Sequence, residues 1–483
     1  MEHSAYSQQV RAVYDAMAAA PADPWRPAYH LTPLSGTLGD PNGLCQWGDT
    51  FHIFYVTSPL ACRTKERTPC VWGHYTTRDF VHYRRQPVAL WPDDRRDRDG
   101  VYSGSALLRD GKLYLYYTGN VRHHGDFDYI HAGREQNVLR AESTDGVHFT
   151  GKTLLMTNED FPAWVTQHVR DPQWVQQNGK LYMLLGARTQ EDEGCALVYE
   201  SEDGTRFRHV NTLRTEQPFG FMWECPDYAV VDGQPLLIAC PQGIPHETYR
   251  FANPHQCGCF PVDGPLSGQT TLGDFISFDY GFDYYAARTL KADDGRVLLF
   301  GWMGMSEADY GCNPCARNGW DQALSLPREL HWVNGALRQT PLRELQALRS
   351  APHTAEGAGG FTAHSRRCEL VLHVKPDTDL TLRLLEDARL CYRAGEGVLT
   401  LDAGTVCGAG RTVRRMKLPR LQTLDLYLDG STLEVFVNEG EAVLTTRLFG
   451  RDDTVAAEPF AGTLEFYTMN AFVLEDADAD PVS

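Results

Sequence analysis

Three acidic residues stand at nearly the same place relative to a repeated turn in this chain. Asp40 and Asp171 each lie eight residues before the glycine of a polar turn, and Glu224 lies nine residues before a third such glycine. Hydrolysis of a glycosidic bond needs two carboxyl groups, one protonated to assist the leaving group and one ionised. Equivalent positions of a rotational repeat point at one axis, so we expect these carboxyl groups to meet in a single pocket.

The neighbours of each carboxyl group suggest its role. Asp40 and Asp171 both precede a proline, which restricts the backbone of the residue before it. Arg170 can donate in a planar fork to a carboxylate or to hydroxyl groups. Glu224 follows a largely apolar run, 218–223, which predicts a raised pKa. We therefore expect Glu224 to be the acid and Asp40 its ionised partner. Taken singly, each motif is more typical of a turn or an ion pair, and their shared position favours a site.

The turns belong to a hairpin pattern that recurs along the first three hundred residues. Asp-Gly and Asn-Gly turns between apolar runs are strong hairpin signals, because both residues tolerate positive φ. The copies are about sixty residues apart, a period that predicts a solenoid or a propeller. They cover residues 47–56, 110–119, 178–187, 232–241 and 293–302.

A second repeated segment supports the same architecture. Residues 76–83, 143–149 and 201–207 share a Ser/Thr-rich start and an aromatic end, and each follows one hairpin at the same spacing. Each would supply an outer strand, and long helical periodicity is lacking here. We predict an all-β fold, with a five-bladed β-propeller as the catalytic domain over residues 30–348.

Three further parts complete the predicted organisation. Residues 1–29 carry apolar side chains at helical spacing, which predicts an N-terminal helical extension. The Gly-, Ala- and Ser-rich residues 349–360 are typical of a linker. Residues 361–483 contain short alternating strands with turns between them, which predict a C-terminal β-sandwich.

Composition narrows the classes of function. At 483 residues the chain exceeds the usual size of one domain, so two domains are expected. The formal charge of −18 argues against nucleic-acid and membrane partners, because both need clustered Lys and Arg. The first residues lack the pattern of a secretory signal, and no apolar stretch approaches the ~18 residues of a membrane span. Thirteen cysteines without regular spacing predict reduced thiols and a cytoplasmic location.

Two cysteine pairs could be combined into a zinc site. Cys257 and Cys259 are too close together for the usual spacing of structural zinc ligands, and Cys312 with Cys315 lacks the context of a redox motif. Ordinary loop thiols are the favoured interpretation. We expect neither a metal nor a cofactor.

Seven short blocks follow one another along the sequence: GDPNG (39–43), VYSGSA (101–106), VRDP (169–172), WECPD (223–227), DYGFDYYAARTL (279–290), GWMG (301–304) and LSLPREL (324–330). In this order they resemble the signature blocks of glycoside hydrolase family 32, which includes invertases, sucrose-6-phosphate hydrolases, levanases and inulinases. The resemblance extends from about residue 30 to about residue 470. It implies a five-bladed propeller followed by a β-sandwich, in agreement with the repeats.

The resemblance also implies a reaction and roles for individual residues. Terminal β-D-fructofuranosyl units would be released from sucrose, sucrose 6-phosphate or short fructo-oligosaccharides by a retaining double displacement. Asp40 would be the nucleophile, Glu224 the acid and base, and Asp171 the transition-state stabiliser. Cys225, next to the acid, would tune its pKa, and Trp47 would add an apolar wall. The substrate-binding set would be Asn42, Trp72, Tyr102, Ser103, Arg170, Cys225 and Trp302.

The chain departs from the family pattern at two positions. Gly39 and Val56 stand where the family usually carries an Asn and a Gln whose amides bind the sugar. Loss of a polar recognition group can change discrimination by orders of magnitude, so an unusual substrate preference is expected. A phosphate site would need a basic side chain near the pocket mouth, with Arg63, Lys65 and Arg122 as candidates. The leaving group and the oligomeric state stay open.

Two other interpretations also stay open. An inverting five-bladed furanosidase of the arabinanase or xylosidase type uses two Asp and one Glu, with its working carboxyls ~6.5–9.5 Å apart instead of ~5–5.5 Å. A carbohydrate-binding propeller that has lost catalysis would fit the missing amides. All three carboxylates are present, which favours an enzyme, and a small-molecule sugar is the expected partner in each case.

Overall fold

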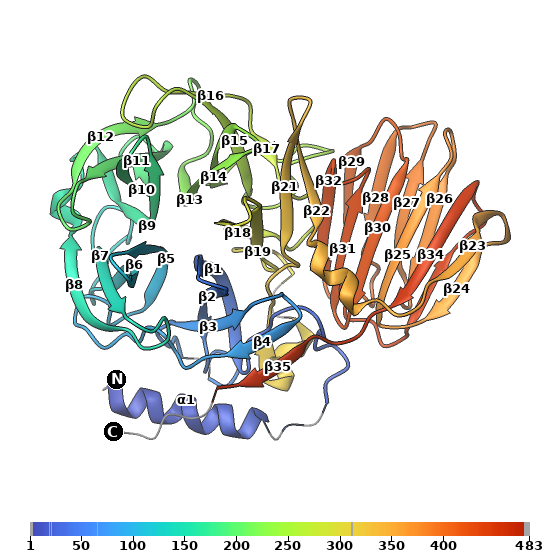
Figure 1. The fold of residues 1–483 in the computed structure, drawn as a ribbon, viewed down its shortest axis with the longest axis horizontal. Helices are drawn as coiled ribbons and strands as arrows, with labels where there is room; N and C mark the ends of the chain where they lie inside the picture. Colours follow the sequence, from blue (N-terminus) through green and yellow to red (C-terminus); the bar gives the residue numbers. More distant parts are fainter. Residues whose placement is uncertain (1–2, 19, 21, 65, 311–312, 478–483) are drawn as a thin grey trace.

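The computed structural model describes residues 3–18, 20, 22–64, 66–310 and 313–477. Its strands form two bodies, a ring of sheets around a central axis and a two-layered stack beside it (Figure 1). Helix α1 (His3–Ala18) lies against the outside of the ring. The all-β prediction, a propeller followed by a β-sandwich, is confirmed.

The strands between residues 36 and 341 pair into five sheets within the described residues. The first contains β1 (Gly36–Trp47), β2 (Thr50–Ser58), β3 (Val71–Thr77), β4 (His82–Arg85), β20 (Trp320–Asp321) and β35 (Val473–Asp476). The second contains β5 (Val101–Arg109), β6 (Lys112–Arg122), β7 (Arg134–Ser143) and β8 (Thr150–Met156). The third contains β9 (Val165–Gln177), β10 (Lys180–Thr189), β11 (Gly194–Ser201) and β12 (Arg208–Leu213).

The remaining two sheets of this region follow in chain order. The fourth contains β13 (Met222–Val231), β14 (Gln234–Gln242), β15 (Gly258–Asp263), β16 (Thr271–Leu272) and β17 (Ile276–Ser277). The fifth contains β18 (Tyr285–Lys291), β19 (Val297–Trp302), β21 (Arg328–Val333) and β22 (Ala336–Pro341). Strands β1, β5, β9, β13 and β18 are innermost and contact one another in a closed ring (Figure 1). This ring supports the predicted five blades.

The predicted hairpin turns have the backbone that their sequences favour. Asp110 and Gly111 have φ of 51° and 73°, and Asn178 and Gly179 have φ of 52° and 74°. Asn, Asp and Gly tolerate this left-handed region, which suits the twist of the flanking strands. Each turn therefore sets the register of its hairpin and, with it, the position of the inner strand along the central axis of the ring.

The C-terminal body is a sandwich of two sheets, each with six strands. Leucines such as Leu370, Leu382 and Leu426 fill the space between the sheets and are fully buried. One sheet contains β23 (His353–Glu356), β25 (Arg367–Val374), β30 (Thr423–Asp429), β31 (Thr432–Val437), β32 (Ala442–Arg447) and β34 (Gly462–Thr468). The other contains β24 (Phe361–His364), β26 (Leu380–Leu384), β27 (Ala388–Arg393), β28 (Val398–Asp402), β29 (Val413–Lys417) and β33 (Thr454–Ala457).

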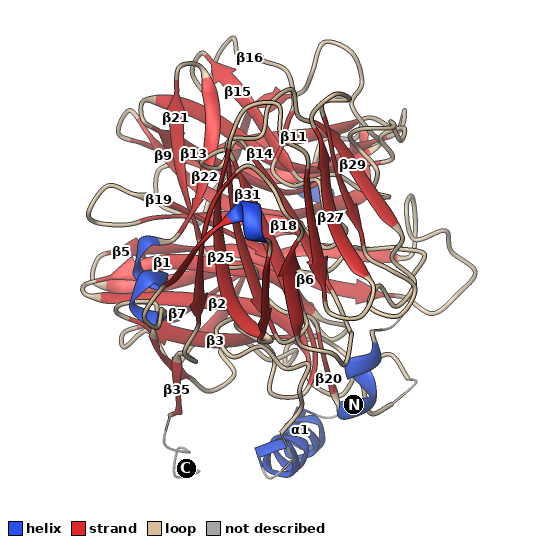
Figure 2. Ribbon diagram, turned by 90° about the vertical axis from the view of Figure 1, so that its right-hand side faces the viewer, coloured by secondary structure: helices blue, strands red, loops and turns tan. Residues whose placement is uncertain are grey.

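Two segments cross the domain limits that the sequence suggests. Strand β23 lies inside the predicted linker, 349–360, and pairs with β34 of the sandwich. Strand β35, near the end of the chain, returns to the propeller (Figure 2) and pairs in parallel with the outer strand β4 (Figure 1). Both gain backbone hydrogen bonds from distant strands, which a local pattern does not reveal. Apart from these segments, 1–29, 30–348 and 361–483 remain the proposed division.

Apolar packing holds the N-terminal helix against the propeller. In α1, Tyr6 and Val10 are buried against Leu60, in the turn after β2, and Val71 of β3, as the apolar spacing predicts. Within the described part of the chain, no helix combines the length and the apolar character that a membrane crossing requires.

Buried ion pairs join the propeller to the sandwich. Arg328 Nη2, on β21, lies 3.0 Å from Glu434 Oε2 on β31 and 2.9 Å from Asp279 Oδ2. Arg411 of the sandwich forms a two-pronged contact with Asp283 at 2.7 Å for each prong. The blocks 279–290 and 324–330 therefore supply much of the interface.

Candidate active site

Every inner strand is interrupted by a β-bulge at the level of the predicted site. A bulge adds one residue to a strand and re-aims its side chain, and bulges are common next to active sites. Asp171 and Cys225, inside two of these bulges, have φ of 65° and 50°. The shifts in register lie at 38–41 in β1, 101–104 in β5, 170–173 in β9, 224–227 in β13 and 285–288 in β18.

Asp40 on β1 is held by side chains from two other sheets. Its Oδ2 accepts a hydrogen bond of 2.5 Å from Ser103 Oγ on β5 and lies 3.7 Å from Cys225 Sγ on β13. Cys225 was expected to act on Glu224, but its thiol faces Asp40 instead. Asp40 is half-buried, so one side of its carboxylate remains accessible.

Asp171 on β9 is fixed more tightly. Its Oδ2 accepts a hydrogen bond of 2.8 Å from the backbone N–H of Cys225, and its own N–H donates to Thr118 Oγ1 at 2.9 Å. The side chain is almost fully buried, and Arg170 and Arg288 offset the cost of its charge. Burial nevertheless raises the pKa of Asp171.

Glu224 on β13 is surrounded by hydrogen-bond donors. Its Oε1 lies 2.5 Å from Arg170 Nη2, and its Oε2 accepts from Gln242 Nε2 at 2.8 Å and from Tyr285 OH at 2.7 Å. Gln242, Tyr285 and Arg288 were not among the residues predicted from the sequence. The guanidinium of Arg288 donates a hydrogen bond to the carbonyl oxygen of Pro226 in the β13 bulge. Tyr285 and Arg288 lie within the 279–290 block, which was the available signal.

The charge states differ from those that the sequence suggests. Burial raises the pKa of Asp40 to about 6, the nearby carboxylates of Asp171 and Glu224 contribute to the rise, and the bond from Ser103 limits it. Burial also acts to raise the pKa of Glu224, but the charge and hydrogen bond of Arg170 outweigh it, and this pKa lies below its ordinary value. The predicted raised pKa of Glu224 is therefore wrong for the protein without substrate.

Strand alternation explains this error. Successive side chains of a strand point to opposite faces, so apolar neighbours in sequence need not surround a polar group. Trp223 is fully buried and stacks on Phe260 with ring centroids 5.0 Å apart, while the next residue, Glu224, meets Arg170. The apolar run therefore packs between the sheets rather than around the carboxyl group.

Two predicted substrate-binding residues have structural roles instead. Trp72 has no exposed surface; it packs on Tyr117 and donates its Nε1–H to the carbonyl oxygen of Tyr102 at 3.0 Å. Asn42 is also fully buried, donating to the carbonyl oxygen of Asp40 and accepting from the N–H of Gly104, both at 2.8 Å. The substrate-binding prediction is wrong for both, because all of their surface is covered, and both position the bulges of β1 and β5.

The other predicted residues lie around the carboxylates. Ser103 and Arg170 bond to them directly, as described above. The hydroxyl of Tyr102 accepts a hydrogen bond of 2.7 Å from Arg67 Nη2. Trp302 is half-buried, and its ring lies 6.5 Å from that of Tyr285, which holds Glu224.

The two departures from the family pattern are neighbours in space. A Cβ atom placed on Gly39 would lie 3.7 Å from the Cβ atom of Val56, across the β1–β2 pair. This is ordinary van der Waals contact, so β1 has room for a side chain here. The two missing amides therefore leave one continuous, uncharged surface beside Asp40.

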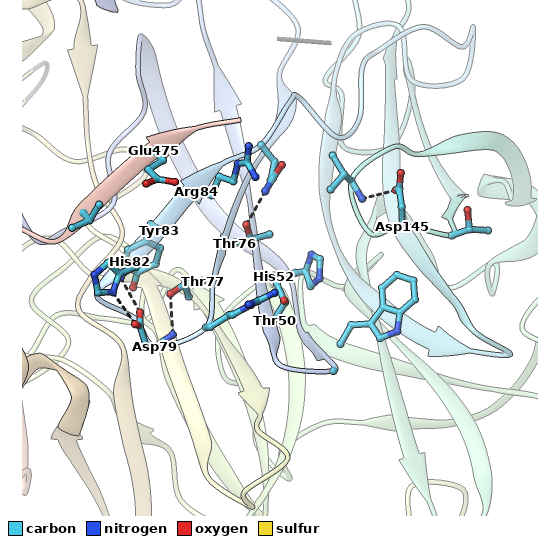
Figure 3. A pocket seen from close by; sticks show the side chains of 17 residues that line it. Thr50, His52, Thr76, Thr77, Asp79, His82, Tyr83, Arg84, Asp145 and Glu475 are labelled. Carbon is cyan, nitrogen blue, oxygen red and sulfur yellow. Dashed lines mark hydrogen bonds and ion pairs between the residues drawn. The ribbon is translucent and has the colours of Figure 1, made fainter. Parts of the chain in front are cut away.

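A separate cavity lies elsewhere and carries none of these groups. It has a volume of about 690 Å³, and polar side chains including Thr76, Asp79 and His82 line it (Figure 3). Trp47 also lines this cavity, so the structure places it there instead of at the expected apolar wall. The three carboxylates and their hydrogen-bond donors, and not the volume of a cavity, therefore identify the candidate active site.

The predicted cysteine and basic candidates separate into different surroundings. Cys257 Sγ lies 3.5 Å from Cys240 Sγ, whereas Cys315 contacts Asp321. Arg63 contacts Met17 of α1, away from the carboxylates. Cys312 and Lys65 fall outside the described residues.

Two family models and several relatives match most of this chain. The family model "Glycosyl hydrolases family 32 N-terminal domain" matches residues 30–341, and "Glycosyl hydrolases family 32 C terminal" matches residues 350–472. A sucrose-6-phosphate hydrolase of Bacillus subtilis (strain 168) is 34% identical over 445 residues, which cover 89% of this chain and 90% of that protein. One from Klebsiella pneumoniae is 36% identical over 456 residues, covering 91% and 92%.

Solved structures agree with these matches. The sucrose-6-phosphate hydrolase of Lactobacillus gasseri superposes with a TM-score of 0.88 at 28% identity, covering 98% of both chains. A family 32 β-fructofuranosidase of Bombyx mori superposes with a TM-score of 0.84 at 26% identity, covering 98% of this chain and 100% of that one. A variant of the latter was solved in complex with sucrose.

Proposed function

This chain belongs to glycoside hydrolase family 32 and is a glycoside hydrolase of the β-fructofuranosidase type, and we propose that it releases terminal β-D-fructofuranosyl units by a retaining double displacement. Sucrose, sucrose 6-phosphate and short fructo-oligosaccharides are the proposed substrates. The observation that carries this proposal is the meeting of Asp40, Asp171 and Glu224, from three inner strands, in one hydrogen-bonded cluster.

In the first step, Asp40 attacks the anomeric carbon of the fructosyl unit while the bond from that carbon to the leaving oxygen breaks. Glu224 donates its proton to the leaving oxygen, so the departing sugar is neutral at that atom. The fructosyl unit is left bound to Asp40 as an ester. Asp40 suits this role because one side of it is accessible while Ser103 holds the other.

In the second step, water replaces the departed sugar. Glu224, now ionised, takes a proton from the water as its oxygen attacks the anomeric carbon. The ester bond breaks, fructose leaves with its original configuration, and Asp40 is again a carboxylate. Two inversions at the same carbon give net retention.

Asp171 and Arg170 steady the sugar while charge develops on its ring. Asp171 is the proposed partner of the fructose hydroxyl groups, because Cys225 fixes its direction and burial strengthens its field. Arg170 bonds Glu224 before substrate binds. When fructose hydroxyl groups accept hydrogen bonds from this guanidinium, Glu224 loses its own hydrogen bond to Arg170, and its pKa rises toward that of an acid catalyst.

The test is release of fructose from sucrose, sucrose 6-phosphate, kestose, inulin and levan, with arabinofuranosides as the contrasting substrates. Glu224→Gln should lower kcat by about 10²- to 10⁴-fold, the usual contribution of a general acid and base. Equal, negligible release by both proteins would instead support a binding protein. An NMR time course of the first fructose anomer formed distinguishes retention from the inverting alternative.

A cytoplasmic site of action is part of the same proposal. The twelve cysteines within the described residues are all free thiols, in keeping with a reducing compartment. Fractionation of the producing cells with this activity as the marker tests it.

A further inference from the structure

Three arginines gather beside Tyr102 at the edge of the candidate active site. Arg67 Nη2 donates to the hydroxyl of Tyr102 at 2.7 Å, and the charges of Arg67 and Arg134 both act on that hydroxyl. Arg122 stacks on the ring of Tyr129 with its guanidinium carbon 4.0 Å from the ring centre. Burial lowers the pKa of Arg134 to about 10, and the neighbouring cations Arg122 and Arg67 add to this effect.

None of the three arginines forms an ion pair with an acidic side chain in the described part of the chain. The Nε–H groups of Arg122 and Arg134 are buried and lack a hydrogen-bond partner. An unpaired buried donor costs free energy unless a ligand satisfies it. In a protein with a formal charge of −18, such a group of cations is an exception in need of an anion.

The acidic groups nearby have other partners. Asp99 Oδ2 accepts from the backbone N–H of Arg122 at 2.8 Å and lies 3.4 Å from Arg98 Nε. Glu135 lies 3.0 Å from His123 Nε2 and accepts from Asn137 Nδ2 at 3.0 Å. Both carboxylates are therefore engaged without neutralising the three guanidinium groups.

A cavity of about 270 Å³ opens at this cluster, with Arg67 and Arg122 in its lining and Arg134 outside the lining. Arg67, Arg122, His123, His124 and Tyr129 contribute to its lining, together with Asp99 and Pro69. Guanidinium groups on its wall can bind phosphate oxygens in pairs, which is the geometry that Arg offers and Lys does not.

Two chains of contacts connect this cluster to the catalytic carboxylates. On one side, Arg67 bonds Tyr102, whose neighbour Ser103 bonds Asp40. Arg67, which lines the cavity, therefore contacts the residue next to Ser103, the side chain that holds the proposed nucleophile.

On the other side, Arg134 Nη1 lies 3.1 Å from His168 Nε2 on β9. Two residues further along β9, Arg170 bonds Glu224, the proposed acid. The cluster is therefore linked to the group that protonates the leaving oxygen, which is the side where the departing sugar lies.

From this arrangement we propose that Arg67 and Arg122 form a phosphate subsite for the leaving sugar, and that the nearby charge of Arg134 supports it. The preferred substrate is then a fructoside whose leaving hexose carries a phosphate group, as in sucrose 6-phosphate. This inference rests on the proposed function and selects among its substrates. A hexose phosphate carries nearly two negative charges at neutral pH, because its second pKa is about 6, and it offers several acceptor oxygens.

The experiment compares kcat/KM for sucrose 6-phosphate and for sucrose in the unmodified chain and in three variants. Arg67→Gln and Arg122→Gln should each lower the ratio of the two values by about 10- to 100-fold, since a hydrogen bond to a charged group is lost. Arg134→Gln should lower the ratio less, because only the charge of Arg134 acts on the cavity. Arg206→Gln is the matched control, because Arg206 is 90% exposed and pairs with Asp203 on an outer turn. Its ratio should match that of the unmodified chain.

Binding is measured separately by calorimetry with glucose 6-phosphate, glucose and inorganic phosphate. Tighter binding of glucose 6-phosphate than of glucose, weakened in the three variants, supports the subsite even if turnover fails. Equal binding of the two sugars, or an unchanged ratio of kcat/KM in all three variants, overturns it. Binding of inorganic phosphate without preference for the sugar phosphate also overturns it, in favour of a separate anion site. Absence of fructose release from every substrate counts against the proposed function alone.

Discussion

Arg170 Nη2 and Glu224 Oε1 lie 2.5 Å apart and join the inner strands β9 and β13 by an ion pair. This contact holds the proposed acid in its ionised form, while burial favours the protonated form of the proposed nucleophile, Asp40. The productive state, with the proton on Glu224, is therefore the minor one in the protein without substrate. The consequences can be measured.

The first prediction concerns the pH dependence of kcat/KM on sucrose, which reports the free protein. The pKa of Glu224 lies below its ordinary value and that of Asp40 is about 6, so between the two pKa values the pair holds one proton. We expect kcat/KM to be highest in this window. Above about pH 6 the remaining proton leaves, and kcat/KM should fall. A value that keeps rising from pH 6 to pH 8 would contradict this assignment.

The second prediction concerns Tyr285, whose hydroxyl donates to Glu224 at 2.7 Å and lowers its pKa. In Tyr285→Phe this pKa should rise, so the acidic limb of kcat/KM should move to higher pH by about one pH unit. Tyr284→Phe is the control, because the Tyr284 hydroxyl is buried without a hydrogen-bond partner. Identical pH profiles for the two variants would show that Tyr285 does not tune the acid.

The third prediction concerns the missing amides. Gly39→Asn together with Val56→Gln should raise kcat/KM for sucrose by about 10-fold, the effect of one restored polar contact. The new side chain on β1 has room, since its Cβ atom would meet Val56 at ordinary contact distance. Thermal unfolding should therefore be nearly unchanged. A loss of activity with intact folding would mean that this uncharged surface serves another substrate group.

The fourth prediction concerns the interface between the domains. Arg328→Met leaves the buried Asp279 without its cation and Glu434 with only His30, 3.2 Å away, so it should lower the free energy of unfolding by about 3–5 kcal/mol. The control is Arg338→Met, because Arg338 is partly exposed and lies 3.5 Å from Glu441. That change should cost less than about 1 kcal/mol. Urea unfolding followed by tryptophan fluorescence compares the two, and equal losses would contradict the interface role.

Local sequence determined the repeated hairpins and the position of the acidic residues in them. Asn178 and Gly179 adopt positive φ because of their own side chains, and such turns set the register of each inner strand. Once the repeat is closed into a ring, residues at the same position must meet near the axis. For this reason the convergence of Asp40, Asp171 and Glu224 was predictable from their spacing.

Tertiary structure alone decided which of these groups favours its protonated form and which of their sequence neighbours are covered. The pKa of Glu224 depends on Arg170 and Tyr285, which arrive from other sheets, and Trp72 is covered by residues of the second sheet. Strand β35 finds its partner in the propeller across almost the whole chain. Burial and electrostatic fields depend on atoms brought together from distant positions, and a local pattern contains no information about those atoms.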